Sequence, residues 1–202
     1  ALAGALADLR IDGYAVPALT SATAQDGQTI TVGAAKLGTF MVMAVSGGVD
    51  VRKDLGSRSF HLRGGLGGLD RAPVRPGQVL PIGGAPQGPD LTASIAPRVS
   101  SGAYRVVLGP QDDYFSEAGI ATFLGETYRV SAEADRMGYR LSGPAIEHAK
   151  GFNIVSDGIV TGSIQVPGSG EPIVLLADRQ TTGGYPKIAT IVSADLPRFV
   201  HQ

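Results

Sequence analysis

The chain has 202 residues, with 17 lysine and arginine residues against 18 aspartate and glutamate residues, so its net charge is −1 at pH 7. This balance supplies no overall basic field for binding nucleic acid or anionic lipid, and we expect neither kind of partner. The 29 glycines and 13 prolines argue against a helical bundle, whereas 43% hydrophobic residues are enough to build a core.

The sequence also excludes several kinds of site. It contains no cysteine, which removes disulfides, thiolate nucleophiles and cysteine-bound metals, and its three histidines lack metal-ligand spacing. We therefore expect no metal site formed by the chain itself. No apolar run is long enough to span a bilayer, so we expect no membrane association and a cytoplasmic location. Because the chain starts at Ala1 rather than methionine, we expect its native N-terminal part to be missing.

Short strands separated by turn residues dominate the predicted secondary structure. Residues 9–11 and 14–16 flank Asp12-Gly13, a dipeptide that suits a type I′ turn and predicts a tight hairpin. Other β-branched or apolar runs predict strands at 28–33, 39–45, 104–108, 127–130, 173–177 and 187–192. The class is therefore mainly β.

Two helices are predicted in the second half of the chain. The first covers residues 114–124, with Asp112 or Asp113 as its N-cap, and a weaker one covers 131–137. Helical spacing places five residues of the first helix against a core: Tyr114, Phe115, Ala118, Ala121 and Leu124.

A weak internal repeat indicates two similar β units. Asp12-Gly13 recurs as Asp157-Gly158, and Gly38 recurs as Gly184, at nearly the same spacing. Chance could also produce this pattern in a glycine-rich chain. The proline, glycine and serine content of residues 86–101 is typical of a linker, so we place the first unit at 1–90, the linker at 91–103 and the second unit at 104–202.

Glycines and arginines are concentrated between residues 56 and 77. Glycine allows backbone N–H groups to converge on a ligand, and arginine matches carboxylate or phosphate with a planar fork. The stretch therefore predicts an anion or substrate site, although a flexible loop with solvated arginines would have the same composition. The candidate binding residues are Arg58, Arg63, Gly64 and Gly65, and His61 in the same loop could act as an acid or base or simply pack.

A second candidate loop follows the apolar strand that ends near Ala177. Its hydrogen-bonding groups predict a binding loop, and a wide turn in which Asp178 caps backbone amides is the structural alternative. The candidate residues are Asp178, Arg179, Gln180, Thr181, Thr182, Gly183, Gly184 and Tyr185.

Two further positions carry groups of interest. Arg136 could clamp an anion and Tyr139 could stack on a ligand or donate a hydrogen bond, although a salt bridge and a packed tyrosine are equally compatible. Asp157 is most simply a turn residue, and it becomes a candidate functional residue only if it faces the other candidate loops.

Five stretches of this sequence resemble the allophanate hydrolase subunit 2 family, also described as the biotin-dependent carboxyltransferase type. They are GSRSFHLRGGLGG, LGPQDDYF, DRMGYRL, SDGIVTGSIQVP and PIVLLADRQTTGGYPKIATIVSADLP, in this order along nearly the whole chain. The family includes the C subunit of 5-oxoprolinase, the KipA protein and a region of urea amidolyase. The resemblance implies two cyclophilin-like β-barrel subdomains with one or two short helices. It also implies a heteromer with a KipI-like homologue of allophanate hydrolase subunit 1, and ends that extend beyond this sequence.

The function implied first is ATP-dependent opening of 5-oxoproline, a small amide substrate, to glutamate together with subunit 1. Phosphorylating the carbonyl oxygen would make the resonance-stabilised lactam reactive, and the site would need cations, oxyanion donors and a base. From these requirements we expect Asp178 or Asp157 to be the base, Arg136 to neutralise charge and the Arg58/Arg63 loop to bind an anion. The sequence contains no GxxxxGK[ST] phosphate loop, so ATP with magnesium would be shared with partner subunits.

Two alternatives remain open. One is carboxyl transfer from carboxybiotin to urea or a similar amide, in which biotin would be carried elsewhere and not attached to this chain. The other is a KipA-like regulator that binds a kinase-inhibitor partner, in which the same loops would hold a protein instead of a substrate.

Overall fold

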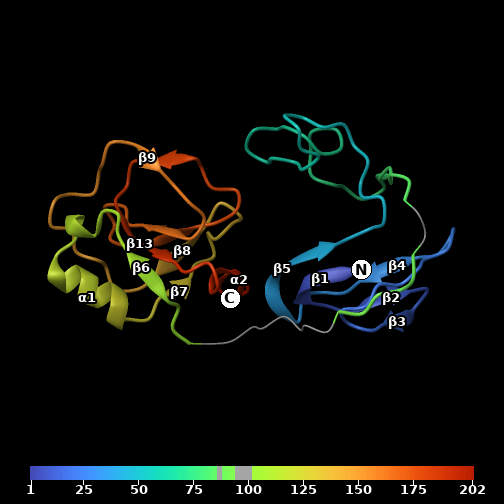
Figure 1. The fold of residues 1–202 in the computed structure, drawn as a ribbon, viewed down its shortest axis with the longest axis horizontal. Coiled ribbons are helices and arrows are strands. Elements are labelled where there is room, and N and C mark those ends of the chain that lie inside the picture. The colour runs from blue at the N-terminus through green and yellow to red at the C-terminus, as the bar shows by residue number, and fades with distance from the viewer. Residues whose placement is uncertain (86–87, 94–101) are drawn as a thin grey trace. The chain divides into compact units, whose positions relative to one another are not determined.

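The computed structural model describes residues 1–85, 88–93 and 102–202. The chain divides into two compact units, residues 1–99 with His201 and residues 100–200 with Gln202. Figure 1 shows short strands and long connections in both units and only short helices in the second, which confirms the mainly β class. Most of the linker predicted at 91–103 lies outside the described residues, so its boundaries stay a prediction.

The first unit contains two small antiparallel sheets. One pairs β1 (Leu2–Leu6) with β5 (Leu37–Met43), and the other has β2 (Leu9–Ile11) between β3 (Tyr14–Val16) and β4 (Ile30–Val32). The predicted hairpin is confirmed, because Leu9 pairs with Val16 and Ile11 with Tyr14. Its turn residues have φ angles of 48° at Asp12 and 82° at Gly13, the left-handed conformation that a type I′ turn requires.

The second unit is built around a six-stranded antiparallel sheet with the order β6-β13-β10-β11-β8-β7. The strands are β6 (Val106–Leu108), β7 (Arg129–Val130), β8 (Gly138–Ser142), β10 (Ser163–Gln165), β11 (Ile173–Leu175) and β13 (Lys187–Ile191). A separate two-stranded ribbon pairs β9 (Asp157–Gly158) with β12 (Thr182–Gly183). In Figure 1 the ribbon lies at the top of this unit.

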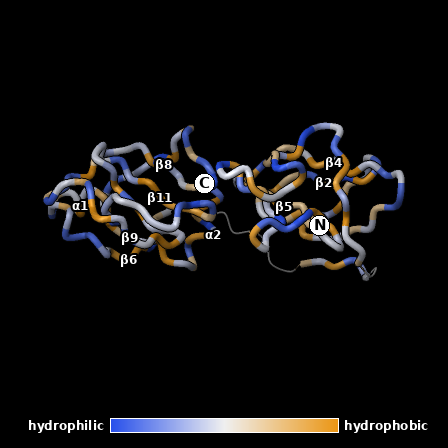
Figure 2. Tube along the Cα trace, turned by 90° about the horizontal axis from the view of Figure 1, so that it is seen from above, coloured by the Kyte–Doolittle hydropathy of each residue, from blue (hydrophilic) through white to orange (hydrophobic). Residues whose placement is uncertain are grey.

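The core of the second unit lies on its central strands. All three residues of β10 are buried, as are four of the five residues of β13, including Ile188 and Ala189. Figure 2 shows how hydrophobic and hydrophilic segments alternate along the chain in both units. Three polar side chains are nevertheless buried on these two strands, namely Ser163, Gln165 and Lys187. A buried polar group costs free energy unless it is hydrogen-bonded, so these three residues need partners.

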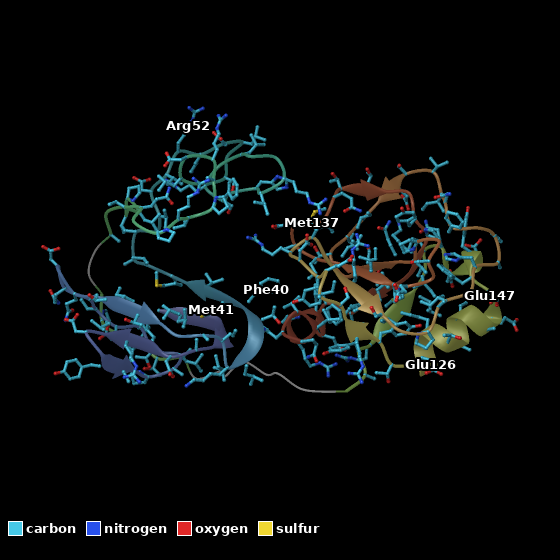
Figure 3. All side chains as sticks on the ribbon, turned by 180° about the vertical axis from the view of Figure 1, so that it is seen from behind. Phe40, Met41, Arg52, Glu126, Met137 and Glu147 are labelled. Atoms are coloured by element: carbon cyan, nitrogen blue, oxygen red, sulfur yellow. The ribbon has the colours of Figure 1, made fainter. Side chains whose placement is uncertain are left out.

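The first predicted helix is confirmed as α1 (Glu117–Gly125), which follows a short 3₁₀ helix, η1 (Asp112–Tyr114). Its predicted cap is wrong, because the Oγ of Ser116 accepts the hydrogen bond from the Gly119 N–H. The predicted core face is also wrong, apart from Phe115 ahead of the helix. Gly119 is the buried residue of α1, and its α-carbon packs against the backbone of Glu147, which Figure 3 shows beside the helix.

The helix predicted at 131–137 is wrong, because these residues form a turn. The Asp135 carboxylate accepts hydrogen bonds from the backbone N–H groups of Met137 and Gly138, and such local side-chain bonds compete with helix formation. A short helix that the sequence does not predict, α2 (Leu196–Phe199), follows β13. Among the described residues, every helix is too short or too polar to cross a bilayer.

Asp195 ties the start of β6 to the end of β13 and makes stability depend on pH. Its buried carboxylate accepts bonds from the Arg105 backbone N–H at 2.9 Å and from the Arg105 guanidinium at 2.8 and 3.1 Å. These bonds hold the pKa of Asp195 well below its ordinary value of 3.8. A lowered pKa in the folded state means that stability is complete above about pH 4 and is lost as the pH falls below it.

We expect the melting temperature of the wild-type chain to fall between pH 6 and pH 3. The Asp195→Asn variant should have a lower melting temperature than the wild type at pH 6, but a much smaller fall between the two pH values. Thermal unfolding followed by circular dichroism at both pH values measures this difference. An equal loss in the two proteins would show that Asp195 is not responsible.

Candidate functional site

The β9–β12 ribbon brings Asp157 beside the loop at 178–185. Gly158 pairs with Thr182, and Asp157 pairs with Gly183. The pairing continues beyond the ribbon, since the Ile159 N–H donates to the Thr181 carbonyl at 3.0 Å. Two candidate stretches that are separate in the sequence are therefore adjacent in the fold, and the turn residue Asp157 belongs to the same surface as the loop.

Lys187 supports the ribbon from the buried side. Its side chain is 3% exposed, and its Nζ donates to Asp157 Oδ2 at 2.5 Å and to the Gly158 carbonyl at 2.7 Å. A lysine is almost never fully buried unless it is paired, and these bonds supply the pairing. Lys187 is the first residue of β13, so the sheet fixes the position from which it holds β9.

Gln111 completes the contact between the sheet and the ribbon. Its backbone N–H donates to the Lys187 carbonyl at 3.1 Å, and its Oε1 accepts from the Lys187 N–H at 3.2 Å. Its Nε2 then donates to Asp157 Oδ2 at 3.1 Å. The side-chain amide can make both of its bonds because it carries a donor and an acceptor.

The partners of Asp157 determine its charge. Hydrogen bonds from Lys187, Gln111 and the Gly158 N–H lower the pKa of Asp157 from 3.8 to about 2. A carboxylate with so low a pKa is ionised at neutral pH but is a weak base. The geometry therefore suits binding or positioning better than the proton abstraction that the sequence suggests for Asp157.

Close packing fixes the path of the loop at Gly183. A β-carbon at this position would lie 2.7 Å from Gln165 Nε2 and 2.7 Å from Ile159 Cδ1. Gln165 is itself 2% exposed, and its Nε2 donates to the Tyr185 carbonyl at 3.2 Å. The buried Gln165 thus holds the loop from below, as Lys187 holds the facing strand.

The polar side chains of the loop divide into paired and exposed groups. Asp178 forms a two-bond ion pair with Arg136, at 3.0 and 3.1 Å, and the Arg179 Nε donates to the Ile159 carbonyl. Both arginines therefore already have oxygen partners within the second unit. The exposed residues of the loop are Gln180, Thr181, Thr182 and Tyr185, while Gly183 and Gly184 are half-buried.

Tyr139 requires a correction. It is 2% exposed, its hydroxyl donates to the Val200 carbonyl at 2.9 Å, and its ring packs against Phe199. A side chain in this position cannot stack on a ligand at the surface. Tyr139 is a core residue of the second unit, which is the structural alternative that the sequence leaves open.

The glycine–arginine loop of the first unit is held by its own polar groups. Arg58 donates to the Val51 carbonyl at 3.0 Å and to Asp50 at 2.7 Å, so its guanidinium ties the loop to the two residues 50 and 51 that precede it. His61 Nδ1 accepts from the Gly64 N–H at 3.0 Å, which gives this histidine a structural contact. Arg63 and Gly64 are exposed, and Gly65 is half-buried.

Asp54 lies just before this loop, and the sequence does not single it out as a candidate. Its Oδ2 accepts from the buried Gly67 N–H at 3.1 Å, and Arg52 and Arg71 lie 3.5 and 3.8 Å from its carboxylate. In Figure 3 the Arg52 side chain extends away from the loop. The charge of these arginines is thus partly balanced by a half-buried carboxylate.

The two candidate surfaces belong to different units, and each is described by itself. Their combination into one site stays a prediction. Among the described residues, no group of three or more histidine, aspartate or glutamate side chains is arranged to hold a metal ion.

Comparison with known proteins identifies the family. Residues 1–201 match the family model described as "Carboxyltransferase domain, subdomain A and B". The chain belongs to this carboxyltransferase A/B family. It is 35% identical to the C subunit of 5-oxoprolinase from Escherichia coli K12 over 196 residues, which cover 97% of this chain and 63% of that protein. The family resemblance predicted from the five motifs is confirmed.

Two further relatives cover nearly the whole chain. Urea amidolyase of Saccharomyces cerevisiae is 27% identical over 219 residues, which span 97% of this chain and 12% of the yeast protein. The crystal structure of TTHA0988 superposes with a TM-score of 0.85 at 32% identity, covering 100% of this chain and 39% of that one. The carboxyltransferase A/B chain therefore spans less than two thirds of each of these relatives.

Proposed function

We propose that this chain is part of a subunit of a 5-oxoprolinase-type enzyme, which opens the cyclic amide of 5-oxoproline together with a homologue of allophanate hydrolase subunit 1. The observation that carries the proposal is the 35% identity to the C subunit of 5-oxoprolinase over 97% of the chain. The matched region includes the whole β9–β12 ribbon and the loop at 178–185. That relative is one subunit of an enzyme, which supports the expectation that this chain has partner chains.

The ribbon and loop provide groups that amide hydrolysis requires. Developing charge on the carbonyl oxygen needs hydrogen-bond donors, and the exposed Gln180, Thr181 and Thr182 side chains offer them. Asp178 is the remaining candidate for a base, oriented by its two bonds to Arg136. In this proposal Arg136 also neutralises charge, while Asp157 positions the substrate.

The arginines predicted to bind an anion or to neutralise charge do not fit a triphosphate as they stand. Arg58 is paired with Asp50, and Arg136 is paired with Asp178. The N-terminus of α1 is also unsuited to binding phosphate, because negative charges surround it. Glu117 lies in its first turn, and Asp112 and Asp113 precede it. We therefore derive no step in which this chain contacts ATP or magnesium.

The test uses the full-length protein mixed with its subunit 1 homologue and any companion subunit, in the presence of ATP, magnesium and 5-oxoproline. We expect glutamate and ADP to form together. Asp178→Ala should lower kcat by at least about a hundredfold, because a positioned base contributes about 10²–10⁴-fold. Asp113→Ala, which removes an exposed carboxylate paired with Lys150, is the matched control and should retain activity.

A second pair of variants tests the loop of the first unit. Arg58→Ala should raise the KM for 5-oxoproline, whereas Arg52→Ala, whose side chain is 85% exposed, should not. A stable complex that forms no glutamate would contradict the proposed function.

Carboxyl transfer is the second candidate, favoured by the name of the family model and by the identity to urea amidolyase. Its decisive feature is a requirement for biotin. Turnover by a complex prepared free of biotin and insensitive to avidin would exclude it, and avidin inhibition with bicarbonate-dependent turnover would establish it in place of lactam opening.

A further inference from the structure

Asp157 retains capacity for one more hydrogen bond. A carboxylate offers about four acceptor positions, two on each oxygen. Among the described residues, Oδ2 accepts from Lys187 Nζ and Gln111 Nε2, and Oδ1 accepts from the Gly158 N–H at 2.7 Å. One acceptor position therefore remains, on Oδ1. The side chain is 50% exposed, so a ligand can reach it.

The charge around Asp157 selects the kind of group that would bind there. Lys187 lies 2.5 Å from Oδ2 and compensates the negative charge, so a second cation gains little from approaching the pair. A neutral N–H donor has a smaller desolvation cost than a cation and still gains a bond to an ionised acceptor. A group that is itself an anionic acceptor, such as an alkoxide, has no proton to donate to this carboxylate and would be repelled by its charge.

The rigidity of the position supports a binding role. Gln111 and Lys187 hold Oδ2 from the side of the sheet, and the Gly158 N–H holds Oδ1 from the ribbon itself. A side chain fixed in this way loses little conformational entropy when a ligand binds. Gln111 and Lys187 thus act as positioning residues for the carboxylate.

We infer that Asp157 Oδ1 accepts a hydrogen bond from the amide N–H of an uncharged lactam or ureido group in the substrate. This deepens the proposed function and rests on it, since it names the atom that recognises the nitrogen side of the scissile bond. It also explains why the β9–β12 ribbon is held by a buried lysine: the lysine orients the acceptor and balances its charge.

The experiment compares 5-oxoproline with the lactone analogue in which a ring oxygen replaces the N–H. Affinities of both compounds for the wild-type complex are measured by isothermal titration calorimetry, and KM and kcat are measured for 5-oxoproline. A site that bonds a substrate N–H rejects an analogue without it, and at this half-exposed position we expect a preference of about tenfold or more. Equal affinities would overturn the inference.

The variant Asp157→Asn isolates the contact. Its carbonyl oxygen can still face Lys187, but its NH₂ group then replaces Oδ1 and cannot accept the ligand N–H. We expect weaker binding of 5-oxoproline by about tenfold, with the lactone affected much less, so that the preference disappears. Asp113→Asn is the control and should keep the preference. A variant that weakens both ligands equally would show a general structural role for Asp157.

The outcomes also separate this inference from the proposed function. A complex that binds 5-oxoproline in preference to the lactone but never forms glutamate would contradict the hydrolase proposal and leave the N–H contact intact. Glutamate formation with an unchanged preference in Asp157→Asn would contradict the contact alone. Binding of neither compound would contradict both. Thermal unfolding of Asp157→Asn alongside the wild type shows whether the variant is folded.

Discussion

Replacing Gly183 with alanine is expected to destabilise the second unit and to reduce the activity of the complex, whereas the same change at Gly184 should alter neither greatly. An added β-carbon at Gly183 would lie 2.7 Å from both Gln165 Nε2 and Ile159 Cδ1. Gln165 and Ile159 are buried, so they cannot move aside without disturbing the core. Overpacking of this kind costs about 1–3 kcal/mol in the free energy of unfolding.

Gly184 is a matched control because it is the next residue of the same loop. The nearest atom to its added β-carbon is the Ile154 carbonyl oxygen at 3.5 Å, an ordinary van der Waals distance. Urea unfolding of both variants measures the difference in stability, and glutamate formation measures the loss of activity. Similar unfolding curves for the two variants would show that the loop adjusts to the added carbon, and that Gln165 does not fix its path.

Features set by neighbouring residues could be predicted from the sequence. The Asp12-Gly13 hairpin is found with the predicted register, because its turn chemistry lies within two residues. The predicted runs also contain the observed strands β6, β7, β11 and β13, although the strands are shorter. The β10 strand is missed because its central position makes it buried on both faces, so Ser163, Ile164 and Gln165 show no alternation that would distinguish the faces.

Helix details depend on contacts that are distant in the sequence. Ser116 caps α1, and its Oγ also donates to Glu147, a residue 31 positions away that no helical pattern indicates. The buried face of α1 is set by the backbone of the same segment, which needs a glycine at position 119. A pattern that counts apolar side chains cannot find a face whose central residue has no side chain.

The candidate site was predictable only in part for the same reason. The composition of the loop at 178–185 indicates hydrogen bonding, and its neighbour Asp157 could be named as a candidate. Lys187 could have been noticed, since it is the one charged residue of a strand whose other members are Ile188, Ala189, Thr190 and Ile191. Gln111 carries no such signal, because its contact with Asp157 spans 46 residues and depends on the tertiary contact between β9 and Lys187.

Removing the buried ammonium group with Lys187→Met is expected to cause the largest combined loss of stability and activity. Methionine retains the apolar stem of the side chain, but the Gly158 carbonyl and Asp157 lose their strongest donor. A hydrogen bond to a charged group contributes about 1.5–3 kcal/mol, so we expect a loss of about 2 kcal/mol in the free energy of unfolding. The KM for 5-oxoproline should rise with it, because Asp157 would no longer be held in place.

Lys150→Met is the matched control, since Lys150 also pairs with an aspartate at hydrogen-bond distance, 2.6 Å from Asp113. Both members of that pair are more than half exposed, and exposed ion pairs contribute little to stability. We therefore expect little change in urea unfolding or in KM. Equal losses in the two variants would mean that burial of Lys187 gives its pair no special role.

The dependence of the free energy of unfolding on pH below about pH 4 distinguishes the contribution of the Lys187 charge from that of its packing. In the wild type the bonds from Lys187, Gln111 and Gly158 lower the pKa of Asp157 to about 2, so its contribution to stability is complete above about pH 4 and is lost as the pH falls toward 2. Lys187→Met should raise this pKa and flatten the profile between pH 4 and pH 2. A variant that is destabilised by the same amount at every pH would have lost packing alone, and the role of Lys187 in orienting a charged acceptor would be wrong.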